Sequence, residues 1–219
     1  MESTAVTCTA KVRQPAPAFE AMSYWNKDFK KISLEQFKGK YVVLFWYPMD
    51  FTFVCPTEII QFSDMAAQFE AANCQVIGAS CDSHFVHKEW TLKDRKKGGI
   101  GEMAIPLLAD ATHRISRAYG ALIDTPGDDA EGIPMRATYI IDDKGILRHM
   151  QINDLPVGRN VPDILRLVEA FQHTDKYGEV CPVNWKKGGA TMVPDADAAK
   201  TKEFFEGQWT FNWWSNQIF

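Results

Sequence analysis

Long apolar runs, a signal sequence and an excess of basic charge are all missing from this 219-residue chain, and each absence excludes a class of protein. No apolar run approaches the roughly 18 residues of a membrane-spanning helix, because the best one, Tyr41–Tyr47, ends at Pro48. Residues 1–8 contain neither a positive nor an apolar segment, so we expect no secretory signal and a cytoplasmic location. The formal net charge of −4 argues against nucleic acid as a partner.

Cysteine is the most informative part of the composition. The chain has five cysteines: Cys8, Cys55, Cys74, Cys81 and Cys181. An odd number in a chain of this length without a visible signal excludes a disulfide scaffold. No Cys-x-x-Cys occurs, which argues against a dithiol oxidoreductase and a zinc ribbon. Three possibilities remain: structural thiols, a catalytic thiol, or two thiols distant in sequence that meet in space.

Patterns typical of strands and helices alternate along the chain. Residues 41–47 predict a strand buried on both faces, and the helical spacing of apolar residues predicts an amphipathic helix over 56–72. Further segments are strands at 75–80 and 105–109, helices at 85–96, 112–119 and 161–173, and a hairpin of strands 137–142 and 146–152. This order predicts a three-layer α/β fold with a mixed sheet, followed beyond Cys181 by an arm.

Cys55 lies at the turn between the buried strand and the helix that follows it. Pro56 suits the first helical position, so Cys55 is expected at or next to the N-cap. Unpaired backbone N–H groups and the helix dipole favour an anion there, and the thiolate is the nucleophilic form of cysteine. The hydroxyl of Thr52 could donate to this thiolate or to a substrate oxygen. These residues leave open a buried structural cysteine, with Thr52 as a turn residue.

The motif Pro48-x-x-x-Thr52-x-x-Cys55, followed by Pro56-Thr57-Glu58, resembles the active-site motif of the peroxiredoxins. It is most similar to the typical two-cysteine subgroup, which includes the tryparedoxin peroxidases. Further matching segments are Gly39-Lys40, Asp82-Ser83-His84, Gly98-Gly99-Ile100-Gly101, Val157-Gly158-Arg159 and Gly178-Glu179-Val180-Cys181-Pro182. The resemblance covers about residues 16–185. It implies a thioredoxin-like fold, with a peroxidase domain over residues 1–172 and a C-terminal arm over 173–219.

The resemblance also assigns roles to individual residues. Cys55 matches the peroxidatic cysteine, and Cys181 in the arm matches the resolving cysteine. The other matches are Pro48 and Thr52 as motif partners, Arg136 as the active-site arginine, and Glu58 and Arg159 as the residues that brace this cluster. Neither a cofactor nor a metal is implied.

The implied chemistry is the reduction of hydrogen peroxide and organic hydroperoxides. Negative charge moves from sulfur to the departing oxygen, so a fixed cation such as Arg136 stabilises the transition state. Cys55 becomes a sulfenic acid, which condenses with a thiol, and a thioredoxin-type reductant reopens the disulfide. In the family the disulfide joins two subunits of a homodimer, which can assemble into a decamer of five dimers. The sequence alone leaves pairing within one chain open.

Several other signals have simpler interpretations. Cys74 and Cys81 bracket a predicted strand, about 20 Å apart, so with His84 and His87 they are interpreted as structural thiols and a solvated histidine pair rather than a metal site. The basic cluster at residues 93–97 is interpreted as a solvated helix end. Trp90, at helical spacing with Val86, is interpreted as a packing residue, and the resemblance leaves open a place in the active-site wall.

The C-terminal segment departs from the family pattern. Glu203-Phe204-Phe205 replaces a Tyr-Phe pair that, with a Gly-Gly-x-Gly loop, favours overoxidation in eukaryotic-type members, so peroxide sensitivity stays open. Residues 207–219 are too aromatic for a solvated tail, and we expect them to pack on their own or a neighbouring subunit, with a membrane or partner dock as the alternative. Two other functions stay open: a redox-regulated holdase chaperone and a peroxide-sensing relay.

Overall fold

The computed structural model describes residues 8–209. The chain divides into two compact units, Met1–Val161 and Pro162–Phe219. The sequence-based division at residue 172, between a peroxidase domain and an arm, stays a prediction. Within the described residues no helix is long and apolar enough to cross a membrane.

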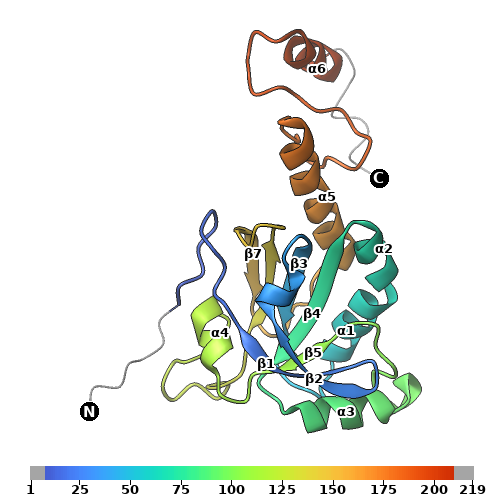
Figure 1. Cartoon of the computed structure of the whole chain (residues 1–219), viewed down its shortest axis with the longest axis vertical. Helices are drawn as coiled ribbons and strands as arrows, with labels where there is room; N and C mark the ends of the chain where they lie inside the picture. Colours follow the sequence, from blue (N-terminus) through green and yellow to red (C-terminus); the bar gives the residue numbers. More distant parts are fainter. Residues whose placement is uncertain (1–7, 210–219) are drawn as a thin grey trace. The chain divides into compact units, whose positions relative to one another are not determined.

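The first unit is built on a mixed sheet, which within the described residues has seven strands in the order β2-β1-β5-β4-β3-β6-β7 (Figure 1). The strands are β1 Glu20–Trp25, β2 Asp28–Ser33, β3 Tyr41–Trp46, β4 Cys74–Ser80, β5 Leu107–Ala109, β6 Arg136–Ile141 and β7 Leu147–Asn153. β4 runs parallel to β3 and to β5, whereas β6 runs antiparallel to β3 and to β7. The predicted mixed sheet and its β6–β7 hairpin are therefore confirmed.

Helices cover both faces of this sheet. They are α1 Cys55–Asp64, α2 Ala66–Ala71, α3 His84–Leu92 and α4 Arg114–Tyr119, with short 3-10 turns η1 Leu34–Phe37 and η2 Arg95–Lys97. Because side chains alternate along a strand, β3 serves two cores. Phe45 stacks on Phe62 of α1 with ring centroids 4.0 Å apart. Its neighbours Leu44 and Trp46 join Tyr119 of α4 in a buried cluster on the other face. The three-layer α/β prediction is confirmed.

Three details differ from the sequence-based expectation. The helix predicted over 56–72 is two helices, separated at Met65, whose φ of −92° and ψ of 2° lie outside the α-helical range. The helix predicted over 85–96 ends at Leu92. The β1–β2 hairpin was not predicted, and it adds an antiparallel edge beside β5.

The C-terminal part of the chain contains two helices within the described residues, α5 Val161–Tyr177 and α6 Ala199–Trp209. The first confirms the helix predicted from residue 161 and extends it past residue 173. The second is an element that the loss of helical spacing after Cys181 did not predict. The aromatic residues of the predicted tail from Phe211 onward lie outside the described residues.

Candidate active site

Cys55 lies where the sequence predicts it, at the start of a helix that follows a buried strand. β3 is buried along its whole length, and α1 begins at Cys55, with Pro56 next in the chain. The Cys55 side chain is fully buried. The thiol is therefore at the positive end of the α1 dipole and shielded from bulk water.

Arg136 faces the Cys55 sulfur. It is the first residue of β6, which pairs with β3 and so brings position 136 beside the start of α1. Its Nη1 lies 3.5 Å from Cys55 Sγ and donates to it. The same guanidinium donates from Nε to the Leu155 carbonyl at 2.6 Å and from Nη1 to Glu58 Oε2 at 2.8 Å. The Arg136 side chain is therefore fixed with its charge against the sulfur.

Glu58 joins Arg136 to a second arginine, Arg159. Glu58 Oε1 accepts hydrogen bonds from the Arg159 backbone N–H at 2.9 Å and from its Nε at 2.8 Å, and Oε2 accepts from Nη2 at 2.8 Å. Arg159 also donates from Nη1 to the carbonyls of Trp46 and Ala137, each at 2.8 Å. All three charged side chains are buried, so the cluster is a rigid brace beneath Cys55.

The cluster beside Cys55 carries a net positive charge. Burial by itself raises the pKa of Glu58, but hydrogen bonds from Arg159 and the positive charges of Arg159 and Arg136 outweigh it and lower the pKa below the ordinary value. Glu58 is thus ionised at neutral pH. Two guanidinium charges face one carboxylate charge, which leaves one net positive charge beside Cys55 Sγ. In a buried site this charge is weakly screened.

Because the pKa of Glu58 is lowered in the folded protein, the free energy of unfolding depends on pH in the acidic range. The folded protein binds this proton less readily than the unfolded chain, so the Glu58 contribution is fully present above about pH 5 and is lost as the pH falls through the lowered value. We expect the difference in free energy of unfolding between wild type and Glu58→Gln to be largest near pH 7 and to shrink toward pH 3, measured by urea denaturation. A difference that is independent of pH would contradict the assignment.

Thr52 and Pro48 lie in the loop before α1. Pro48 is buried two residues after β3, and the Thr52 hydroxyl donates to the Met49 carbonyl at 2.8 Å. Its donor proton is thus directed into the loop and not to Cys55, whereas Arg136 provides the donor at the sulfur. The assignment of Thr52 as a partner of the substrate stays a prediction.

A buried polar network under this loop escaped sequence reasoning. Asp50 Oδ1 accepts from the Tyr47 hydroxyl at 2.8 Å, and Asp50 Oδ2 lies 2.8 Å from His87 Nδ1. The Asp50 backbone N–H donates to Asp82 Oδ2 at 3.0 Å. The network anchors the loop that precedes Cys55 to α3 and to the segment between β4 and α3.

The interpretation of His84 and His87 as a solvated pair is wrong for His87. This side chain is fully buried between the Asp50 carboxylate and the Leu108 carbonyl, which lies 3.2 Å from Nε2. Its spacing of three residues from Trp90, on the buried face of α3, was the available signal. Trp90 is fully buried and packs on Phe51, which agrees with its interpretation as a packing residue.

Cys181 lies in the second unit, just after α5. Its side chain is half-buried, with Sγ 3.7 Å from the Ala170 carbonyl oxygen and 3.9 Å from Thr174 Oγ1. The thiol therefore rests against the last turns of α5.

The remaining three cysteines lie in environments that differ from that of Cys55. Burial raises the pKa of Cys74 and of Cys81 to about 12, so both stay thiols at neutral pH. Cys74 is the first residue of β4 and Cys81 follows its last residue, as predicted. Neither forms the thiolate, which is the nucleophilic form of cysteine. Cys8 is exposed near the start of the described residues.

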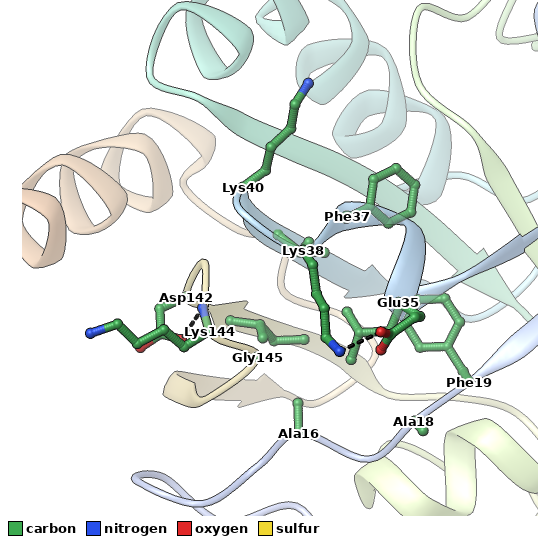
Figure 2. Close-up of a pocket in the computed structure, with 13 residues that line it drawn as sticks. Ala16, Ala18, Phe19, Glu35, Phe37, Lys38, Lys40, Asp142, Lys144 and Gly145 are labelled. Atoms are coloured by element: carbon green, nitrogen blue, oxygen red, sulfur yellow. Dashed lines mark hydrogen bonds and ion pairs between the residues drawn. The ribbon is translucent and has the colours of Figure 1, made fainter.

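A pocket of about 230 Å³ lies elsewhere in the first unit, between η1 and the turn of the β6–β7 hairpin (Figure 2). None of the predicted site residues lines it. Its Lys38 pairs with Glu35, and the side chains of Lys40 and Lys144 point away from the hollow. The pocket is therefore separate from the Cys55 site.

Comparison with known proteins places this arrangement in a family. Residues 12–150 match the AhpC/TSA family, and residues 170–207 match the C-terminal domain of 1-Cys peroxiredoxin. The chain belongs to the AhpC/TSA family and is a peroxiredoxin, an oxidoreductase with thiol peroxidase activity.

Individual relatives are similar over nearly the whole chain. Peroxiredoxin 2 of Drosophila melanogaster is 57% identical over 196 residues, which cover 90% of this chain and 97% of that protein. Peroxiredoxin-2 of Bos taurus is 52% identical over 201 residues, covering 92% and 98%. The crystal structure of the reduced 2-Cys peroxiredoxin of Plasmodium vivax matches with a TM-score of 0.81 at 42% identity, covering 85% of this chain and 95% of that one.

Proposed function

We propose that the protein reduces hydrogen peroxide and organic hydroperoxides through a sulfenic acid on Cys55, which Cys181 of a partner subunit resolves as a disulfide. A thioredoxin-type donor then reduces this disulfide. The observation that carries the proposal is the 3.5 Å contact between Arg136 Nη1 and Cys55 Sγ inside a buried, net-positive cluster.

In the first step the Cys55 thiolate attacks one oxygen of the peroxide. The sulfur–oxygen bond forms as the oxygen–oxygen bond breaks, and the leaving oxygen takes up a proton to become water or an alcohol. Cys55 is oxidised to the sulfenic acid and the peroxide is reduced. Arg136 stays charged throughout and lies where negative charge leaves the sulfur, and Glu58 keeps it in place.

In the second step the Cys181 thiol attacks the sulfenic sulfur, and one water leaves as the disulfide forms. The match of residues 170–207 to a peroxiredoxin C-terminal domain supports a role for this segment. A human relative, 49% identical over 205 residues, is named "Thioredoxin-dependent peroxide reductase, mitochondrial", which supports a thioredoxin-type donor.

The proposal includes a homodimer, able to form a decamer of five dimers, that acts in the cytoplasm in antioxidant defence and redox homeostasis. Exposed apolar side chains on the first unit support an interface between copies: Phe53 is 91% exposed and Phe85 60%. A holdase chaperone function has its only sequence support in the aromatic tail, most of which lies outside the described residues. A peroxide-sensing relay is the other alternative.

Substitution of Cys181 tests the proposal. We expect Cys181→Ser to lose steady-state turnover with a thioredoxin-type donor, because no disulfide forms, while one equivalent of peroxide is still consumed per Cys55. On a non-reducing gel, peroxide-treated wild type should run as a dimer and Cys181→Ser as a monomer. Cys81→Ser serves as the matched control and should behave as wild type. An oxidised wild type that stays monomeric would contradict pairing between subunits.

A further inference from the structure

Glu179 lies two residues before Cys181 and is held by three side chains. Its Oε2 accepts a hydrogen bond from Thr191 Oγ1 at 2.5 Å and lies 3.1 Å from His173 Nε2. Its Oε1 accepts from Lys200 Nζ at 2.5 Å. Both carboxylate oxygens are therefore engaged by donors.

These donors come from three different segments of the second unit. His173 belongs to α5, Thr191 to the segment between the helices, and Lys200 to the first turn of α6. One carboxylate thus joins both helices to the short stretch that carries Cys181. The hydrogen bonds from Lys200, Thr191 and His173 lower the pKa of Glu179 to about 2, so the carboxylate is charged at neutral pH.

The backbone around Glu179 is fixed as well. Val180 and Met192 form an antiparallel bridge, in which the Val180 N–H donates to the Met192 carbonyl at 2.8 Å and the Met192 N–H donates back at 3.1 Å. Trp185 holds the segment after Cys181 against α5. Its carbonyl accepts a hydrogen bond from Arg166 Nη1 at 3.2 Å, and its ring centroid lies 5.1 Å from that of His173.

Cys181 is turned toward α5 by this arrangement. Its Sγ lies 3.7 Å from the Ala170 carbonyl and 3.9 Å from Thr174 Oγ1, and the side chain is half-buried. A thiol in this position has to leave its contacts with α5 before it can reach a sulfur on another segment.

We propose that Glu179 is a positioning residue that restrains Cys181 against α5 and so sets how fast Cys181 resolves the oxidised Cys55. The proposal rests on the proposed function. The restraint acts on a competition between two reactions. In one, the Cys181 thiol condenses with the Cys55 sulfenic acid, giving the disulfide and water. In the other, a second hydrogen peroxide oxidises the sulfenic acid to the sulfinic acid and is itself reduced to water.

The first test measures the exposure of the Cys181 thiol without any peroxide. The reduced, full-length protein is treated with iodoacetamide, and the alkylation rate of Cys181 is followed by peptide mapping. We expect Glu179→Ala to raise this rate by about five- to thirty-fold, as loss of one or two kcal/mol of restraint implies. Glu179→Gln, which keeps an acceptor for Thr191, should lie between Glu179→Ala and wild type.

Two further variants complete this test. Thr191→Val removes one hydrogen bond to Glu179 at nearly constant volume and should also raise the alkylation rate of Cys181. This variant keeps the proposal testable if Glu179→Ala fails to fold. Glu169→Gln removes the ion pair between Glu169 of α5 and the largely exposed Lys187, and it should stay within about two-fold of wild type, because pairs open to solvent contribute little. Unchanged Cys181 alkylation in folded Glu179→Gln and Thr191→Val would overturn the proposal.

The second test measures the outcome of the competition. After a pulse of excess peroxide, mass spectrometry gives the fraction of Cys55 that carries two added oxygens. Faster resolution in Glu179→Ala should lower this fraction at least about five-fold relative to wild type, in line with the faster alkylation. An unchanged fraction despite faster alkylation would overturn the link to resolution. Absence of any Cys55–Cys181 disulfide in wild type would instead refute the proposed function, and the restraint on Cys181 would stand on its alkylation rate alone.

Discussion

Replacing Cys55 with serine is expected to lower kcat/KM for hydrogen peroxide by at least about 10³-fold, to the background of the assay, because removal of a nucleophile leaves only residual catalysis. A serine hydroxyl does not ionise near neutral pH, so the net positive charge of the Arg136–Glu58–Arg159 cluster has no sulfur anion to stabilise. The measurement is peroxide consumption with dithiothreitol as the reductant, which requires no particular protein donor.

The matched control for Cys55→Ser is Cys74→Ser. Cys74 is also buried, but burial raises its pKa to about 12 and no arginine is among the groups that shift it, so its removal should change kcat/KM by less than about two-fold. Circular dichroism would establish that both variants are folded. Substantial turnover by purified, folded Cys55→Ser would refute the assignment of the nucleophile.

Removal of the Glu58 carboxylate is expected to have the largest effect on stability. In Glu58→Ala, Arg136 and Arg159 stay buried without their shared carboxylate. Breaking a buried ion pair by removing one partner costs about 3–5 kcal/mol, because an uncompensated charge is left behind. We expect the free energy of unfolding, measured by urea denaturation at pH 7, to fall by that amount. Peroxidase activity should fall as well, since Arg136 is no longer held against Cys55.

Glu35→Ala is the matched control for the stability of Glu58→Ala. Glu35 pairs with Lys38 on the surface, where both side chains are mostly exposed. Exposed pairs contribute at most about 1 kcal/mol, so this substitution should leave the urea midpoint nearly unchanged. If Glu58→Ala were no more destabilised than Glu35→Ala, the buried cluster would not be the brace that its geometry describes.

Strong local patterns predicted most of the first unit. The β-branched and aromatic run at residues 41–47 and the hairpin around Asp143-Lys144-Gly145 are visible without any structure. The β1–β2 hairpin was missed because its turn, Asn26-Lys27, reaches positive φ without the glycine that marks such turns. The interruption at Met65 was missed because the helical spacing of apolar residues, which includes Phe62 and Phe69, continues across it.

The site could be predicted from the sequence only where it depends on local patterns. The position of Cys55 at the start of a helix follows from the local sequence. Arg136, Glu58 and Arg159 were assigned only through the resemblance, because they are brought together by strand pairing between distant segments. The Asp50–His87 contact joins a loop to a helix 37 residues away, and no spacing rule connects such positions.

The most direct test of the account is to trap the oxidised sulfur. Cys181→Ser protein is treated with one equivalent of hydrogen peroxide in the presence of a 1,3-diketone that reacts with sulfenic acids, and peptide mapping locates the adduct. The account predicts a single major adduct on Cys55 and none on Cys74 or Cys81, whose raised pKa values keep them as thiols. An adduct mainly on another cysteine, with Cys55 unmodified, would contradict it.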